Sequence, residues 1–173
     1  MAKVLTAFFS RADENYFGGV MRYIEVGNTE VAVEKIKERI DTDIFKIEMK
    51  TSYAKEYKTC IDQAKKDKQN DARPELVPLP DSIDSYDTII LAYPNYWSTM
   101  PMAVFTFLDA FSFKGKTILP LCTNEGSGMG TSEGDIKKIC AGADVKKGLP
   151  LNGSNVGKAD AQIENWLKTN NLI

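Results

Sequence analysis

The stretch Thr88–Pro101, TIILAYPNYWSTMP, decides the fold. Its first part, Thr88–Tyr93, is an apolar run that ends at Pro94. Such a short run, bounded by a proline, is typical of a central parallel strand that is covered on both faces. Pro101 then opens a helical pattern, since proline is well tolerated in the first turn of a helix. The stretch therefore predicts a buried strand, an aromatic loop and a helix.

Strand and helix patterns alternate along the rest of the chain. Further strands are predicted at Lys3–Phe9, Ile44–Met49, Lys116–Cys122 and Asp144–Leu151. Helices are predicted after an N-cap at Thr29, within Ser52–Asn70, after Pro101, at Ile136–Ala141 and at about Lys158–Asn170. This order implies an α/β fold, a parallel sheet with helices on both faces and right-handed crossovers. Because no repeat or linker interrupts the pattern, we predict a single domain over residues 1–173.

The composition excludes several kinds of site. The chain has no histidine, which rules out Ser-His-Asp hydrolysis, Cys-His catalysis and histidine metal sites. Its formal net charge of −2 argues against general attraction to nucleic acid. Cys60, Cys122 and Cys140 are far apart and odd in number, which fits neither a zinc site nor a disulfide framework and favours a reducing cytoplasm. If the protein is an enzyme, we expect a bound cofactor to carry the chemistry.

Three loops leave the carboxyl ends of the first, third and fourth predicted strands: Ser10–Thr29, Pro94–Met100 and Thr123–Gly134. In open parallel sheets, ligands bind at this edge, where the strand order reverses. The first loop ends in Gly27-Asn28-Thr29 at a helix start, where unpaired N–H groups and the helix dipole favour an anion. With Ser10, it predicts a phosphate cradle made of neutral donors. The alternative is a plain N-cap after a loop.

The second and third loops carry the features that suit a planar ligand. Tyr96 and Trp97 are adjacent, so both cannot point into one core, and a flat ring at this edge suits stacking. The alternative is a rigid hydrophobic turn that packs for stability. Thr123–Gly130 is rich in glycine and small polar residues, whose backbone amides could bind a heterocycle, unless the loop is merely flexible. No Walker pattern occurs, so a nucleoside triphosphate is not expected.

Together these segments resemble the FMN-binding segments of bacterial flavodoxins. The resemblance rests on Ala7-Phe8-Phe9-Ser10, Gly27-Asn28-Thr29, Tyr93–Pro101 and Cys122–Gly128, in the right order over nearly the whole chain. It is strongest to a subgroup with a tryptophan in the second loop followed by Met-Pro. The resemblance implies a three-layer, doubly wound, five-stranded parallel sheet in the order 2-1-3-4-5, and non-covalently bound flavin mononucleotide (FMN).

The resemblance also implies the residues of the cofactor site. The phosphate would be held by Ser10, Gly27, Asn28 and Thr29. The isoalloxazine ring would be lined on one side by Pro94, Asn95, Tyr96 and Trp97, and on the other side by Thr123, Asn124, Glu125 and Gly126. No catalytic residue and no metal ligand is expected.

The chain departs from the flavodoxin pattern at two places. Sixteen residues, Arg11–Val26, split the first loop, which is compact in typical flavodoxins. The aromatic residues Tyr16, Phe17 and Tyr23 predict that this insertion packs against the protein. Asn124 stands where the subgroup often has histidine, and an asparagine side chain cannot change its charge with pH.

The favoured function is a flavodoxin-type electron carrier, in which FMN does the redox chemistry and the protein tunes it. Glu125 is the candidate carboxylate that disfavours an anionic reduced flavin, because like charge and burial both oppose ionisation. One alternative is an NAD(P)H-dependent quinone or nitro reductase, in which a nicotinamide must stack on the flavin. Another is a flavin-free interaction module of the same fold. We expect redox partner proteins to dock transiently at the loop face, with no nucleic-acid or membrane partner.

Overall fold

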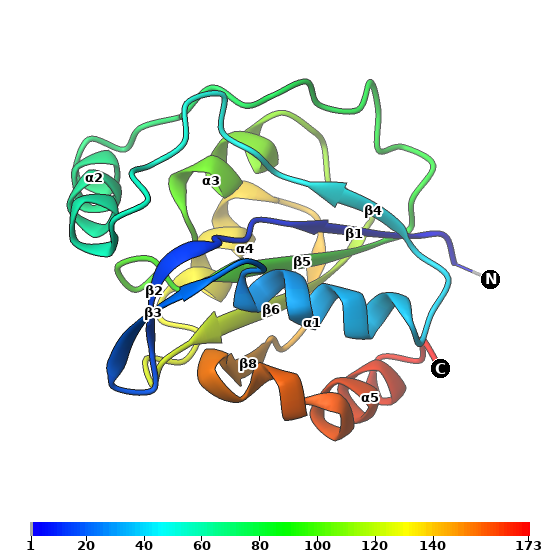
Figure 1. The fold of residues 1–173 in the computed structure, drawn as a ribbon. Helices are drawn as coiled ribbons and strands as arrows, with labels where there is room; N and C mark the ends of the chain where they lie inside the picture. The colour runs from blue at the N-terminus through cyan, green and yellow to red at the C-terminus, as the bar shows by residue number, and fades with distance from the viewer. Residues whose placement is uncertain (1) are drawn as a thin grey trace.

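The computed structural model describes residues 2–173 and contains one central, fully parallel, six-stranded sheet (Figure 1). Its strands are β1 (Val4–Phe8), β4 (Asp43–Lys46), β5 (Thr88–Pro94), β6 (Thr117–Asn124), β7 (Asp144–Val145) and β8 (Leu149–Asn152). The order is β4-β1-β5-β6-β7, and β8 also pairs with β6. Since β7 and β8 pair with successive parts of β6, they share one position in the sheet. The predicted order 2-1-3-4-5 is therefore confirmed.

The fifth position of the sheet is interrupted, which the single predicted strand Asp144–Leu151 did not anticipate. β7 pairs with Thr117 and Ile118, whereas β8 pairs with Leu121–Asn124. Pro120 lies between these two pairings. Proline has no backbone N–H to donate to a neighbouring strand. The break between β7 and β8 beside Pro120 therefore leaves no N–H of that residue without a partner.

Helices cover both faces of the sheet, as expected for a doubly wound fold. α1 (Asn28–Lys37) and α5 (Asp160–Thr169) lie on one face, with the 3-10 helix η1 (Gly153–Lys158) before α5. α3 (Met102–Asp109) and α4 (Ser132–Ile139) cover the other face. Ile36, Leu119 and Ile163 belong to the first core cluster, and Ile89 and Phe107 belong to the second, all fully buried. The chain thus forms the three layers that the alternation of patterns predicts.

Helix α2 (Tyr57–Gln69) is the exception, because it does not pack on the sheet. Its buried residues, Cys60 and Ala64, belong to neither core cluster. Figure 1 shows α2 beside the end of the molecule that carries β2 and β3. The face that such a helix would cover is instead filled from an irregular segment, residues 70–87. Ile83 is 1% exposed there, and Leu76, Leu79 and Tyr86 of the same segment pack against the core cluster to which Ile83 belongs.

The insertion Arg11–Val26 is an antiparallel hairpin of β2 (Asp13–Phe17) and β3 (Val20–Ile24). Its turn is Gly18-Gly19, and both glycines have a positive φ, which suits a two-residue hairpin turn. The prediction that its aromatic residues pack it down is wrong for two of them, since Tyr16 is 41% and Tyr23 65% exposed. The hairpin stands out from the sheet rather than lying against it (Figure 1).

Three element boundaries also differ from the predictions. The N-cap of α1 is Gly27, not Thr29, and the Oγ of Ser10 accepts the N–H of Glu30 in its first turn. The strand predicted at Ile44–Met49 is shortened to β4, and α4 begins four residues earlier than predicted. No helix within residues 2–173 is long and apolar enough to cross a membrane.

The buried position of Ile83 makes the irregular segment part of the core. We expect Ile83→Ala to lower the free energy of unfolding by about 2–4 kcal/mol, through lost burial and the cavity left behind. Val20→Ala, at a side chain 55% exposed on the hairpin, should cost less than about 1 kcal/mol. Urea unfolding measures both. Equal losses would show that residues 70–87 do not support the core.

Candidate functional site

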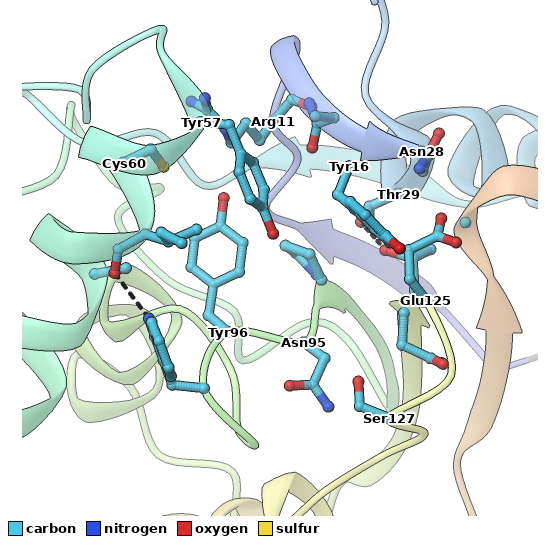
Figure 2. Close-up of a pocket in the computed structure, with 18 of the residues that line it drawn as sticks. Arg11, Tyr16, Asn28, Thr29, Tyr57, Cys60, Asn95, Tyr96, Glu125 and Ser127 are labelled. Carbon is cyan, nitrogen blue, oxygen red and sulfur yellow. Dashed lines mark hydrogen bonds between the residues drawn. The ribbon is translucent and has the colours of Figure 1, made fainter. Parts of the chain in front are cut away.

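A cavity of about 360 Å³ lies at the carboxyl ends of β1, β5 and β6 (Figure 2). Ligand pockets of proteins start at about this volume. Nine residues predicted for the site line the cavity: Asn28, Thr29, Pro94, Asn95, Tyr96, Trp97, Thr123, Asn124 and Glu125. The fold therefore brings the three predicted loops to one place, although they are far apart in the sequence.

Ser10 and Gly27 do not line the cavity but support its first wall. Ser10 Oγ accepts the N–H of Glu30 at 3.1 Å, which fixes the start of α1. The hydroxyls of Thr29 and Thr123 are 2.7 Å apart, so they tie α1 to β6. The first N–H groups of α1, at Asn28 and Thr29, have no partner within the helix and add the positive end of its dipole. This end of the cavity suits an anion held by neutral donors.

Gly27 is required here by close packing rather than by backbone conformation. Its φ is −65°, which any residue can adopt. A Cβ on Gly27 would instead collide with Ser10 Oγ and come within 2.6 Å of the carbonyl oxygen of Arg11. Gly153 plays a similar part on η1, because its Cβ would lie 2.6 Å from Asn28 Nδ2. Both glycines let separate segments meet at the cavity wall.

The second loop makes a tight turn over Tyr96–Thr99, in which Trp97 and Ser98 both have a positive φ, 54° and 73°. The turn is closed by Tyr96 N–H donating to Thr99 O at 2.7 Å and Thr99 N–H donating to Tyr96 O at 3.3 Å. Asn95 Oδ1 also accepts the Ser98 N–H at 3.0 Å. Such conformations cost energy for residues other than glycine and persist where the surroundings hold them.

Tyr96 and Trp97 diverge, as their adjacency predicts. The ring of Tyr96 packs edge-on against Phe9, with centroids 5.9 Å apart. Trp97 turns toward α2, where its Nε1 donates to Ile61 O at 2.8 Å and Lys65 Nζ lies 5.0 Å from its ring. Lys68 Nζ donates to the Trp97 carbonyl. The second loop is thereby anchored to the displaced helix.

The third loop contributes side chains more than backbone amides. Asn124 Oδ1 accepts the N–H of Gly126 at 2.9 Å, so this amide is already used. Gly126 has φ +113° and does not line the cavity; Ser127 does. Glu125 accepts a hydrogen bond from Ser154 Oγ through one carboxylate oxygen. The expectation that Gly126 contacts a ligand is therefore not supported by the arrangement of this loop.

One whole wall of the cavity is not predicted from the sequence. Ten further residues line it: Arg11, Asn15, Tyr16, Tyr57, Cys60, Ile61, Ala64, Ser98, Ser127 and Gly153. Most belong to the hairpin and to α2. The helical spacing of Tyr57, Cys60 and Ala64 did indicate an apolar face, but the same pattern serves a helix on a sheet. No feature of the sequence indicates that this apolar face of α2 points toward the cavity.

Hydrogen bonds clasp the hairpin and α2 together. Glu14 on β2 accepts the N–H of Tyr57 at the start of α2, at 2.9 Å. Arg11 donates through its terminal nitrogens to the carbonyl oxygens of Ala54, Lys55 and Glu14, at 2.8–3.0 Å. We call these bonds the Arg11–Glu14 clasp. They join the hairpin to α2, which also contacts the second loop through Trp97.

Three buried polar atoms have no hydrogen-bond partner within the described residues, and all three belong to residues that line this cavity: Arg11 Nε, Tyr96 Oη and Glu125 Oε1. Buried polar atoms in proteins are almost always paired, so such a cluster indicates a ligand or bound water. Burial raises the pKa of the Tyr96 hydroxyl well above its ordinary value, and it also raises the pKa of Tyr57 and Cys60. These three groups are therefore protonated and neutral at pH 7.

The fold and the cavity define an α/β protein of the flavodoxin-like class, with its site at the point where the strand order reverses. A family model described as flavodoxin matches residues 19–170. The chain therefore belongs to the flavodoxin family, whose cofactor is FMN. No curated protein matches the chain.

Solved structures share the fold. A protein described as a flavoprotein from Bacteroides uniformis ATCC 8492 has a TM-score of 0.77 at 24% identity, covering 96% of this chain and 98% of that chain. A protein also described as a flavoprotein, from Bacteroides eggerthii DSM 20697, has a TM-score of 0.76 at 24% identity, and the match covers 98% of each chain. A flavoprotein in complex with FMN from Lactobacillus acidophilus NCFM has a TM-score of 0.65 at 17% identity, and the match covers 91% of this chain and 98% of that chain.

Gly27 provides a test of the phosphate cradle. We expect Gly27→Ala to weaken FMN binding at least about tenfold, because the new Cβ pushes Ser10 and Arg11 away from the start of α1. Gly157→Ala, which meets no atom within 4 Å, is the matched control. Quenching of flavin fluorescence measures the affinity. Unchanged affinity in Gly27→Ala would remove this loop from the site.

Proposed function

We propose that this protein binds FMN in the described cavity and serves as an electron carrier. FMN binding is supported by family membership and by the fit of the residues to the cofactor. FMN has a phosphate, hydroxyl groups and a planar ring with a polar edge. The cavity offers the unpaired N–H groups at the start of α1, aromatic side chains from three elements, and three buried polar atoms without partners. It offers both donors and an acceptor, as a ligand of mixed polarity requires.

When bound, FMN supplies one- and two-electron redox chemistry, and the chain binds, orients and shields it. Asn28 and Thr29 would hold the phosphate, while Tyr96 and Trp97 would line the ring. Thr123 and the rest of the third loop would close the other side. Tyr57 and the apolar face of α2 add a cover that keeps water from the cavity.

The observation that carries the electron-carrier assignment is the position of Trp97. A reductase must let a nicotinamide ring stack on the flavin before hydride transfer. Trp97 lines the cavity, is anchored to α2 through Ile61 and Lys68, and is 39% exposed. A nicotinamide would have to displace both this ring and its hydrogen bonds. Electron transfer from the flavin edge to a redox protein that docks transiently needs no such opening.

Stopped-flow spectroscopy tests this function. The purified protein is loaded with FMN and mixed without oxygen with either dithionite or NADPH. We expect dithionite to bleach the flavin fully and NADPH to give no fast phase, because Trp97 blocks stacking. Rapid bleaching by NADPH would favour a quinone or nitro reductase instead. A protein that remains colourless after FMN is added would contradict both functions.

Glu125 is expected to set the potential of the second one-electron reduction of FMN. Its half-buried carboxylate, with Oε1 buried, disfavours negative charge on the reduced flavin, so Glu125→Gln should raise that potential. Glu133→Gln, on α4 outside the cavity lining, is the control for loss of one carboxylate. A spectroelectrochemical titration measures the shift. An identical potential in Glu125→Gln and the unchanged protein would remove Glu125 from this role.

A further inference from the structure

The three unpaired polar atoms divide by chemistry as well as by place. Figure 2 shows Arg11 and Tyr96 on the side of the cavity toward α2, and Asn28 and Glu125 on the other side. The first side holds two groups that can donate and have no partner: Arg11 Nε, which only donates, and the Tyr96 hydroxyl, which can also accept. The second holds an acceptor without a donor, Glu125 Oε1. We therefore expect the part of the ligand that is rich in hydrogen-bond acceptors to bind at the α2 side of the cavity.

The Arg11–Glu14 clasp fixes the side chain of Arg11, which cannot turn away from the cavity without breaking its hydrogen bonds to the backbone. Nη1 donates to Ala54 O, and Nη2 donates to Lys55 O and Glu14 O, whereas the buried Nε has no partner within the described residues. Because the guanidinium is planar and rigid, fixing two nitrogens also fixes the direction of the third. The clasp that positions α2 thus also presents a donor and a positive charge to the cavity.

Tyr96 is also held in place. Its ring packs edge-on against Phe9 at the end of β1, and its hydroxyl lies next to the thiol of Cys60. A thiol is a weak hydrogen-bond partner, so the hydroxyl keeps its capacity to donate to a ligand. Arg11 and Tyr96 come from different loops, yet both are fixed by contacts outside the cavity. Such preorganised donors bind an acceptor at low entropic cost.

We propose that Arg11 and Tyr96 form a donor pair that binds the carbonyl edge of the isoalloxazine ring, and that Arg11 favours negative charge on the fully reduced flavin. The proposal rests on the proposed FMN binding. The phosphate is the other acceptor-rich part of FMN, but the N–H groups of Asn28 and Thr29 already provide for it on the opposite side of the cavity. Arg11 therefore opposes Glu125: one charge stabilises the reduced anion and the other destabilises it.

Affinity for two flavins tests the donor pair. Riboflavin has the same ring as FMN but no phosphate, so a ring contact affects both ligands and a phosphate contact affects FMN alone. We expect Tyr96→Phe to weaken binding of FMN and riboflavin alike by about tenfold, the value of one buried hydrogen bond. Tyr53→Phe is the matched control, since Tyr53 donates to Asp67 and does not line the cavity.

The potential of the second one-electron reduction tests the charge of Arg11. We expect Arg11→Gln to lower it by about 59 mV, which is a tenfold loss in the relative binding of the reduced flavin. Glu14→Ala loosens the clasp but keeps Arg11, so it separates the charge from a general loosening of α2. Arg11→Lys keeps the positive charge, so its potential should lie close to that of the unaltered protein.

Several results would overturn the proposal while leaving the proposed function intact. A loss of affinity for FMN but not for riboflavin would assign Arg11 or Tyr96 to the phosphate. An unchanged potential in Arg11→Gln, or an equal shift in Glu14→Ala, would show that the charge does not act on the ring. Unchanged affinities in Tyr96→Phe would mean that its hydroxyl meets only water. Failure of the unaltered protein to bind either flavin would instead contradict the proposed function itself.

Discussion

The burial of β5 on both faces of the sheet is the constraint on which the rest of the structure depends. Ile89, Ile90, Leu91 and Ala92 are 0% exposed, and β5 is paired with β1 on one side and β6 on the other. An apolar strand in this position needs cover on both faces, and helices between parallel strands provide it. Because all strands of the central sheet point the same way, the loops that follow them meet at one edge. The cavity is a geometric consequence of how the core is buried.

The chain departs from this simple scheme at α2, and the departure creates the second wall of the cavity. The irregular segment around Ile83 covers the sheet face, which frees α2 to stand at the sheet edge. There it is held by the Arg11–Glu14 clasp and by the hydrogen bond from Trp97. These contacts are mostly polar and lie outside both cores. The inserted hairpin is thus a structural support for α2 as well as part of the site.

The polarity of the cavity follows from the same arrangement. The start of α1 supplies neutral donors, Glu125 supplies a carboxylate, and Arg11 supplies a fixed positive charge at the opposite side. Flavin potentials respond to such charges because a buried site has a low dielectric constant. A site with opposed charges at its two ends distinguishes the parts of a ligand by their polarity. It also makes the potential sensitive to small movements of either charged side chain.

The sequence by itself determined the alternation of strands and helices, the parallel sheet and the three loops that form the first walls of the cavity. These follow from local patterns: apolar runs such as Thr88–Tyr93, a helix start after Gly27, and the adjacency of Tyr96 and Trp97. Only the tertiary structure decided where α2 packs, that Arg11 enters the cavity, and that the Gly126 amide is already used. The reason is physical. An apolar helix face buries equally well on a sheet or over a cavity. Ile83 occupies the sheet face, and Glu14 binds the start of α2 beside the cavity, so the position of α2 depends on contacts between segments that are far apart in the sequence.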